Sequence, residues 1–433
     1  MAKKIRYRVT SVHQFALSEV VQALGEHERV VVGVDVAKRK FVASLCGPEG
    51  QVERLVSFEH PADTRAFVDR LVAIKATGKV VEVALEPTGT YGDPLRYLLD
   101  EAGVPVFRVN NKRVHDAAEL FDGSRTKHDS KDACVIAWLH AQKRSALWPV
   151  VSPEQREVRA LVSQREVFDG PLRQQLARME PLLAKYFPEL EGFFDLYRRK
   201  TPYRLLMHFG SPKALAKAGH EEVTRRWHEA ARKTPAPDKV EALLKAASGT
   251  TGVAPTANEI ELIRVMCGEI LRLMKLRDEV DKRIEDAVKD QACCQAMRPR
   301  LGAVTAAVIY AFMGDPSQYQ GASAFEKAAG LNLVERSSGE HVGQRRISKR
   351  GPAIVRKYLF LAAMRLVKDD PLAKAWYQKR RSFTDEDGGK LRALIAVVRK
   401  LCRALHHVAG GQPFTVEQLF DARALRSQSS EAA

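Results

Sequence analysis

The feature that most constrains the fold is a carboxylate inside an apolar run near the start of the chain. Residues Val30–Val36 have the nearly continuous apolar character of a buried strand, and Asp35 lies within it. Burying a carboxylate is costly unless it is paired or coordinates a metal ion. We therefore expect a buried strand whose carboxylate is paired or coordinates a metal ion.

The segments that follow are typical of alternating strands and helices. Strands are predicted at Phe41–Cys46, Val52–Phe58, Val80–Leu85 and Val104–Val109, and helices at Pro61–Ile74, after Pro87–Gly89, at Lys112–Leu120 and at Ser130–Gln142. A meander of three strands followed by alternating helices and strands is the order of an RNase H-like (RuvC-like) α/β domain. We assign this domain to residues 29–150, after an N-terminal arm or short helix at residues 1–28.

Three further acidic residues have spacings that could place them near Asp35. Glu86 ends an apolar strand, and Asp129 and Asp132 are three residues apart at a predicted helix start, which puts them on one face. Together with Asp35 they could converge on hard divalent cations, the usual device for cleaving phosphodiesters. Taken singly, Asp129 or Asp132 is explained equally well as a helix cap, and Glu86 as a surface charge.

Residues 151–297 are predicted to be mainly helical. A long helix begins near Pro153, and we expect Gly170-Pro171 to kink or interrupt it. A second helix, Asn258–Asp290, carries a heptad stripe from Ile263 to Ala287 with Arg277 at its one polar position. Packing within the chain and a dimerising coiled coil explain this stripe equally well, although we expect dimerisation. Residues 191–255 between the helices are predicted to be a small helical insert.

The last segment, residues 298–433, is predicted to be a mainly α-helical domain with one polar loop, Ser337–Gly351. Helices are expected at Gly302–Met313, Ser323–Ala329, Pro352–Val367 and Lys390–Val408. Between Arg345 and Arg403 there are 17 basic and 5 acidic residues, so this domain is expected to contact nucleic acid most directly. The candidate phosphate-binding side chains are Arg345, Arg346, Lys349, Arg350, Arg356 and Lys357. Ser338, which precedes a glycine in this loop, is a candidate nucleophile, although Ser-Gly is also ordinary loop chemistry.

The whole chain has a formal net charge of +17, which favours a polyanionic partner. Its six cysteines include no CxxC pair, and no His/Cys cluster has zinc spacing, so a reduced protein is expected. The N-terminus lacks the apolar core of a signal peptide, and no apolar run is long enough for a membrane span. We expect a cytoplasmic, nucleoid-associated bacterial protein with no membrane contact.

The motifs GVDVAK, LEPTGTY and KHDSKDA resemble, in order and spacing, those of the RuvC-like domain of bridge-RNA-guided DEDD transposases, which are related to Piv-type DNA invertases. The C-terminal run AAGLNLVERSSGEHVGQRRISKRGPAIVRKYLFLAAM resembles that family's second domain. The resemblance covers about residues 30–187 and 256–420. Pro87 stands where the family commonly has alanine, and Arg300–Ala303 replaces its usual Pro-Gly-Ile-Gly hairpin.

This resemblance implies that Asp35, Glu86, Asp129 and Asp132 bind Mg²⁺ (or Mn²⁺) and that Ser338 attacks DNA to form a 5′-phosphoserine. It also implies strand exchange between donor and target DNA, a noncoding bridge RNA as guide, and a homodimer that assembles into a tetramer with nucleic acid. Two alternatives remain open. One is a RuvC-like junction nuclease whose C-terminal domain only binds DNA, and the other is a catalytically silent nucleic-acid-binding protein.

Overall fold

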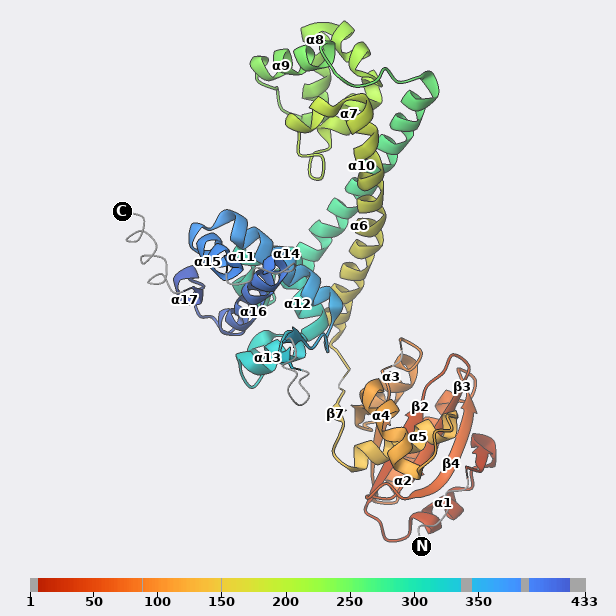
Figure 1. Cartoon of the computed structure of the whole chain (residues 1–433). Helices are drawn as coiled ribbons and strands as arrows, with labels where there is room; N and C mark the ends of the chain where they lie inside the picture. The colour runs from red at the N-terminus through yellow and green to blue at the C-terminus, as the bar shows by residue number, and fades with distance from the viewer. Residues whose placement is uncertain (1–6, 88, 149, 336–344, 383–388, 421–433) are drawn as a thin grey trace. The chain divides into compact units, whose positions relative to one another are not determined.

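The computed structural model describes residues 7–87, 89–148, 150–335, 345–382 and 389–420. The chain divides into two compact units, Met1–Val151 and Ser152–Ala433. The first unit is built on a mixed β-sheet, and the second is almost entirely helical (Figure 1). The expected mixture of an α/β N-terminal domain and a mainly helical remainder is therefore confirmed.

The sheet of the first unit has the strand order β1-β4-β3-β2-β5-β6-β7. Its strands are β1 (Val9–Ser11), β2 (Arg29–Asp35), β3 (Lys40–Cys46), β4 (Val52–Glu59), β5 (Val80–Leu85), β6 (Val106–Arg108) and β7 (Ala146–Leu147). Strands β2, β3 and β4 form an antiparallel meander, while β5 and β6 lie parallel to β2 on its other side. The five predicted strands are all present, and their connectivity is that expected of an RNase H-like domain.

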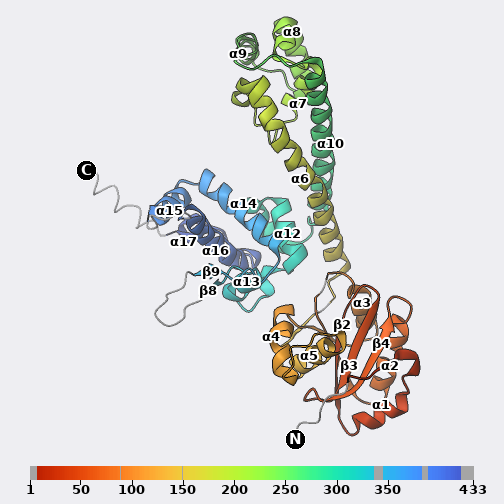
Figure 2. The same ribbon diagram turned by 45° about the vertical axis from the view of Figure 1, so that its right-hand side comes forward.

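Helices cover both faces of this sheet (Figure 2). On one face, α1 (Leu17–Leu24), α2 (Thr64–Ala76) and α3 (Asp93–Glu101) share a core with Val30, Val32 and Val34 of β2. On the other face, α4 (Asn111–Asp122) and α5 (Asp129–Ala141) pack over Ala84 of β5. Because side chains alternate between the faces of a strand, Val31 of β2 is buried on this second face, where it clusters with Ala137 of α5.

The described part of residues 1–28 contains a short helix, one of the two expected forms, and in addition an edge strand that was not predicted. Strand β1 pairs in parallel with β4 at the edge of the sheet, and α1 buries Val20 and Leu24 in the core of the same unit. The polar composition of this segment concealed these contacts, because an edge strand and a one-sided helix need few apolar residues.

The second unit contains two long helices that lie side by side, α6 (Pro153–Tyr186) and α10 (Ala257–Ala287) (Figures 1 and 2). Helix α6 is continuous through Gly170-Pro171, so of the two predicted outcomes, a kink or an interruption, the interruption is wrong. A proline removes one backbone hydrogen bond, and here the next turns are held by Leu172 and Leu176, which are buried in the core.

The heptad stripe of α10 is covered by the protein's own chain. Ile263, Ile270 and Leu273 share a core with residues of α6 and α7, and Val280 and Ile284 share a second core with α6 and the C-terminal helices. The stripe therefore gives no physical reason for dimerisation, because the apolar area that prompted this expectation is already buried.

Residues 191–255 form the expected helical insert, which packs on the adjoining ends of α6 and α10 in one shared core. It comprises α7 (Thr201–Phe209), α8 (Pro212–Ala231) and α9 (Pro237–Ser248), preceded by the 3₁₀ turn η2 (Pro188–Gly192). Beyond α10, the described helices are α11 (Ala292–Leu301), α12 (Ala303–Met313), α13 (Ala322–Ala328), α14 (Ala353–Asp369), α15 (Pro371–Ser382), α16 (Gly389–Ala409) and α17 (Val416–Leu419). The four helices predicted here are present as α12, α13, α14 and α16.

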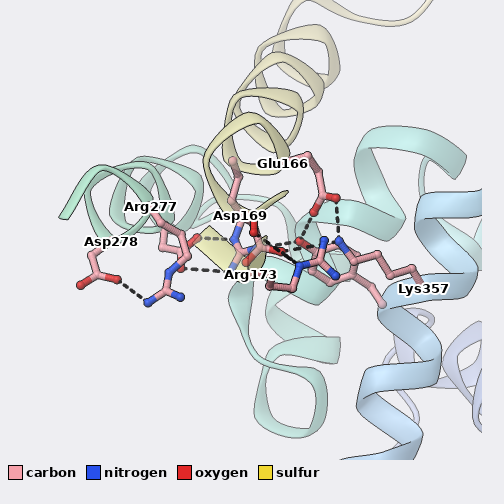
Figure 3. A network of polar contacts seen from close by, with 9 residues as sticks. Glu166, Asp169, Arg173, Arg277, Asp278 and Lys357 are labelled. Atoms are coloured by element: carbon pink, nitrogen blue, oxygen red, sulfur yellow. Dashed lines mark hydrogen bonds and ion pairs between the residues drawn. The ribbon is translucent and has the colours of Figure 1, made fainter. Parts of the chain in front are cut away.

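A network of charged side chains joins α6, α10 and α14 (Figure 3). The guanidinium of Arg165 donates to Asp281 at 2.5 Å and to the hydroxyl of Tyr358 at 2.8 Å. Lys357 donates to Glu166 at 2.6 Å, and Glu166 also accepts from Tyr358 at 2.7 Å. Arg165 interrupts the apolar spacing of α6, and the network explains why a charged residue is retained at a helix contact.

The cysteines and the helices can be compared with the expectations of a reduced protein and of no membrane span. All six cysteines are free and buried. Over the described ranges, no helix combines the length and the apolar character needed to cross a bilayer.

Candidate functional site

Asp35 and Glu86 lie at the carboxyl ends of neighbouring parallel strands. Val34 of β2 pairs with Leu85 of β5, so the residues that follow them stand next to each other in the sheet. Gly33 pairs with Ala84 in the same register, and Asp35 and Glu86 are each two residues further along. They therefore project from the same face as Ala84, which is the face that α5 covers.

Helix α5 crosses β2 in close contact at Gly33. A β-carbon on Gly33 would lie 2.3 Å from the carbonyl oxygen of Ala133 and 2.3 Å from the amide nitrogen of Ala137. Only glycine permits this approach. Because Gly33 is two residues before Asp35 on the same face, the contact brings the first turn of α5, with Asp129 and Asp132, toward Asp35.

The C-terminal end of α5 is anchored near the amino ends of β2 and β5. His140 Nε2 lies 3.1 Å from a carboxylate oxygen of Glu82, which also accepts a 2.7 Å hydrogen bond from Arg29. Glu82 pairs with Val31 near the start of β2. The helix thus runs from the carboxyl ends of β2 and β5, where Asp35 and Glu86 lie, to the amino ends of the same two strands.

The four predicted carboxylates, hereafter the carboxylate cluster, interact electrostatically. Burial and, after it, the charges of Asp129, Asp132 and Glu86 together raise the pKa of Asp35 to about 7, against a hydrogen bond from the backbone of Val36. Burial, and then the charge of Asp132, raises the pKa of Glu86. Burial also raises the pKa of Asp132, partly offset by Lys127. The structure therefore brings all four predicted acidic residues together in one region of excess negative charge.

Four carboxylates are the ligands that hard divalent cations such as Mg²⁺ and Mn²⁺ prefer. A cation also relieves the repulsion that raises the pKa of Asp35. In the conformation described here, the described residues include no group of three or more His, Cys, Asp or Glu side chains arranged to hold one ion. The chemical character of the cluster suits a cation, whereas its side-chain geometry does not yet enclose one.

A buried lysine fixes the loop that leads into α5. Lys131 is fully buried and forms an ion pair of 2.7 Å with Asp122, and its ammonium also donates to the carbonyl of Ser124 at 2.6 Å. Asp122 accepts a further 2.6 Å hydrogen bond from Tyr7. At the helix start, the ring of His128 accepts a 3.1 Å hydrogen bond from the amide of Lys131. These contacts hold the two ends of the 122–128 segment on which the position of Asp129 depends.

Sequence reasoning missed Gly33, Lys131 and the capping role of His128. Their motifs were quoted, GVDVAK for its aspartate and KHDSKDA for its two aspartates, but the other residues in them were not assigned roles. A lysine between two aspartates, directly before the apolar run of the helix, was the available signal, since lysine is almost never fully buried unless paired.

The candidate nucleophile Ser338 lies outside the described residues, as does the adjacent Ser337. The residues on both sides of this segment are held together by a short antiparallel pair, β8 (Leu333–Val334) and β9 (Arg346–Ile347). The hydroxyl of Ser348 donates to the side chain of Asn332 at 2.5 Å and adds to this closure. The base of the loop is therefore fixed on the helical unit.

Two glycines bring the far end of the loop against the turn after α13. A β-carbon on Gly351 would lie 2.2 Å from the carbonyl oxygen of Ala328. Gly330 has φ of 71°, and a β-carbon there would lie 2.7 Å from the amide of Arg350. Both positions need glycine because two stretches of backbone are in contact.

The predicted phosphate-binding side chains have different surroundings. Lys349 and Arg350 are exposed, and Arg345 forms an exposed ion pair of 2.8 Å with Glu335. Arg356 is half-buried and donates to the carbonyl of Gly351 at 2.7 Å. Lys357 is engaged with Glu166 in the charged network, and Arg346 belongs to β9. The residues nearest the loop are thus the most accessible, whereas Arg356 and Lys357 have structural partners.

Comparison with known proteins assigns both ends of the chain. Residues 32–188 match a family described as "Transposase", and residues 297–378 match one described as "Transposase IS116/IS110/IS902 family". The uncharacterized 44.8 kDa protein of insertion element IS116 from Streptomyces clavuligerus is 27% identical over 381 residues, which are 86% of this chain and 93% of that protein. The uncharacterized 43.6 kDa protein of insertion element IS110 from Streptomyces coelicolor is 25% identical over 364 residues, 82% of this chain and 88% of that protein.

A further similarity is confined to one part of the chain. The pilin gene-inverting protein of Moraxella bovis is 27% identical over 157 residues, 36% of this chain and 47% of that protein. The chain combines an α/β unit that carries a carboxylate cluster with a basic helical unit, and both units match transposases. Together these features define a transposase of an insertion element, a kind of DNA recombinase. The chain belongs to the IS110/IS116 family of these proteins.

Proposed function

We propose that this transposase cuts and rejoins DNA by metal-assisted attack of Ser338 on a phosphodiester. The observation that carries the proposal is the convergence of Asp35, Glu86, Asp129 and Asp132, whose mutual repulsion and burial raise the pKa of Asp35 to about 7. Excess negative charge of this kind supports binding of Mg²⁺ or Mn²⁺, which would supply charge neutralisation at the attacked phosphate. The resemblance noted in the sequence supports the same roles for these residues.

In the serine step, one ester bond to phosphorus is exchanged for another. The hydroxyl oxygen of Ser338 attacks phosphorus, its proton passes to water or a nearby base, and the bond from phosphorus to the 3′ oxygen of the neighbouring nucleotide breaks. The product is a 5′-phosphoserine and a free 3′ hydroxyl. Reversal of this step with a 3′ hydroxyl from the other DNA rejoins the strands and releases the serine, which gives strand exchange between donor and target DNA.

The proposed complex contains a noncoding bridge RNA and more than one copy of the chain. The net charge of +17 and the exposed Lys349 and Arg350 beside the loop support binding of nucleic acid. We propose that homodimers assemble into a tetramer on the RNA and both DNAs. Light scattering of the protein alone and with nucleic acid tests this arrangement, and a monomer under both conditions would contradict it.

The test of the serine step is a covalent adduct. The protein is incubated with RNA transcribed from the noncoding end of its element, with DNA duplexes of both kinds and with Mg²⁺, and DNA ends are examined for a protease-sensitive attachment. Ser338→Ala is expected to lose the adduct and Ser337→Ala to retain it. Asp35→Ala is expected to lose both cleavage and adduct while its circular dichroism spectrum is unchanged.

The outcomes also separate the proposed function from a simple nuclease. A RuvC-like nuclease needs only the carboxylate cluster and a metal-bound water, so it would cut DNA in Ser338→Ala and form no adduct in any variant. Cleavage without an adduct in the unmodified protein would therefore overturn the serine step and leave the metal site intact.

A further inference from the structure

A cavity of about 320 Å³ lies on the face of the sheet that carries Asp35. Asp35 of β2 pairs with Val42 of β3, and Val42 pairs with Ser57 of β4, so the three residues form one row across the sheet. Val42 and Ser57 line the cavity, and Asp129 of the carboxylate cluster is also part of its wall. Adjacent strands are roughly 5 Å apart, so the cavity begins about one strand spacing from Asp35.

The wall of this cavity is rich in hydrogen-bond donors. It includes Lys40, which is exposed and carries an ammonium group, and Ser57 and Ser130, which are both half-buried and carry hydroxyls. Among the residues that the structure describes, no ion pair is formed by Lys40 and no side-chain hydrogen bond by Ser57 or Ser130. Three polar groups are thus available to a ligand in one small space.

His128 adds a donor of defined tautomer. Its Nδ1 accepts the 3.1 Å hydrogen bond from the amide of Lys131, so in the neutral ring the proton is on Nε2. The ring packs edge-on against Tyr7, with 4.4 Å between the centroids, which fixes its plane. Val9 and Val42 complete the lining with apolar surface.

The position of the cavity indicates which part of a DNA strand would enter it. A phosphodiester held at the carboxylate cluster has Glu86 on the β5 side, where a second phosphate would be repelled. On the other side the wall also contains the carboxylate of Asp129, but Lys40, Ser57 and Ser130 there can donate to a phosphate. A volume at the lower end of the range of about 300–1,000 Å³ for small-ligand sites accommodates one nucleotide unit.

We propose that this cavity binds the DNA nucleotide that adjoins the cut phosphodiester, with Lys40 contacting its phosphate and Ser57 and Ser130 its sugar–phosphate oxygens. The assignment rests on the proposed function, because the position of the cut defines which nucleotide is adjacent. It adds a specific contact on the N-terminal unit, whereas sequence reasoning expected phosphate binding mainly in the C-terminal segment.

The experiment removes one phosphate charge at a time. A duplex that spans one end of the element is prepared with a neutral methylphosphonate at each successive position around the cut. Its affinity for the full-length protein with bridge RNA is measured by fluorescence anisotropy in Ca²⁺. Neutralising the adjoining phosphate is expected to weaken binding about tenfold, as for the loss of one charge-assisted hydrogen bond.

The DNA affinity of Lys40→Gln is expected not to change when the adjoining phosphate alone is neutralised, because this variant has already lost the contact between Lys40 and that phosphate. Lys143→Gln is the matched control, since Lys143 is also exposed but follows the far end of α5, about 20 Å from Asp129 by helix length. This control is expected to retain the full tenfold effect. Ser57→Ala is expected to weaken binding to all duplexes equally, with an unchanged melting temperature.

The outcomes are separable from those of the proposed function. If Lys40→Gln and the unmodified protein respond identically at every position while the cut and the adduct still form, the subsite is wrong and the recombinase proposal stands. Suppose instead that no adduct forms, and that neutralising the adjoining phosphate weakens DNA binding by the unmodified protein but not by Lys40→Gln. The cavity then binds the strand and the serine mechanism is wrong.

Discussion

The ammonium of Lys131 lies 2.7 Å from a carboxylate oxygen of Asp122, and the side chain of this lysine is only 1% exposed. The pair joins the first turn of α5, which carries Asp129 and Asp132, to the end of α4. A structural ion pair is thus built directly beside the candidate catalytic residues. It stabilises the loop between the two helices without being one of the predicted metal ligands.

Lys131→Met is expected to lower the free energy of unfolding by about 2 kcal/mol, because Asp122 and the carbonyl of Ser124 both lose their charged donor. The double variant Lys131→Met with Asp122→Asn is expected to lose less free energy of unfolding, since no unpaired charge remains. Lys112→Met is the control, because Lys112 is 62% exposed and its pair with Asp116 contributes little. Denaturant unfolding measures all three, and equal stability of Lys131→Met and Lys112→Met would contradict this role.

Gly33→Ala is expected to displace α5, because the new methyl group would lie 2.3 Å from backbone atoms of Ala133 and Ala137. Overpacking of this kind costs about 2 kcal/mol, and the shift should also reduce metal affinity at the carboxylate cluster. Gly92→Ala is the matched control in the same unit, since its nearest contact would be an ordinary 3.5 Å to Val36. Thermal unfolding and Mn²⁺ titration by calorimetry measure the two effects, and normal Mn²⁺ binding by Gly33→Ala would count against this geometry.

Stability without metal is expected to depend on Asp35 between pH 4 and 7. The pKa of Asp35 is about 7 in the folded protein against 3.8 ordinarily, so the folded state holds a proton that the unfolded state has released. This contribution is complete below about pH 4 and is lost as the pH rises through 7. His140, whose pKa is lowered mainly by burial, acts in the opposite direction, so the measurement must compare variants.

The comparison is between the unmodified protein and Asp35→Asn. In metal-free buffer, the melting temperature of Asp35→Asn minus that of the unmodified protein should increase from pH 5 to pH 8. Added Mg²⁺ should stabilise the unmodified protein more at pH 8 than at pH 5, because protons compete with the cation for the carboxylates. A difference independent of pH would show that Asp35 titrates normally.

The charged network of Figure 3 is expected to couple the long helices to α14. Arg165→Met removes the partner of Asp281. Because the arginine side chain is only 14% exposed, the free energy of unfolding should fall by about 3 kcal/mol. Arg173→Met is the control, because Arg173 is 56% exposed at the edge of the same network. Hydrogen exchange should show earlier exchange of α14 amides in Arg165→Met alone, and unchanged protection there would contradict the coupling.

Much of the fold and of the candidate site follows from local patterns in the sequence. The strands from Val30 to Leu85 were predictable because their apolar runs have the length and boundaries of buried strands. Asp35 was identifiable for the same reason, since a carboxylate in such a run is costly without a function. Asp129 and Asp132 followed from helical spacing, a property of the residues themselves.

The contacts that only the tertiary structure decided are those between segments far apart in the chain. The stripe of α10 was visible in the sequence, but its partner was not, because an apolar surface is satisfied equally by another part of the chain or by a second molecule. Gly33 acquires its role from Ala133, and Lys131 from Asp122 and Ser124. The sequence by itself determined which residues carry charge into the sheet, and the packing of α5 on β2 decided that they meet, because steric fit depends on both surfaces at once.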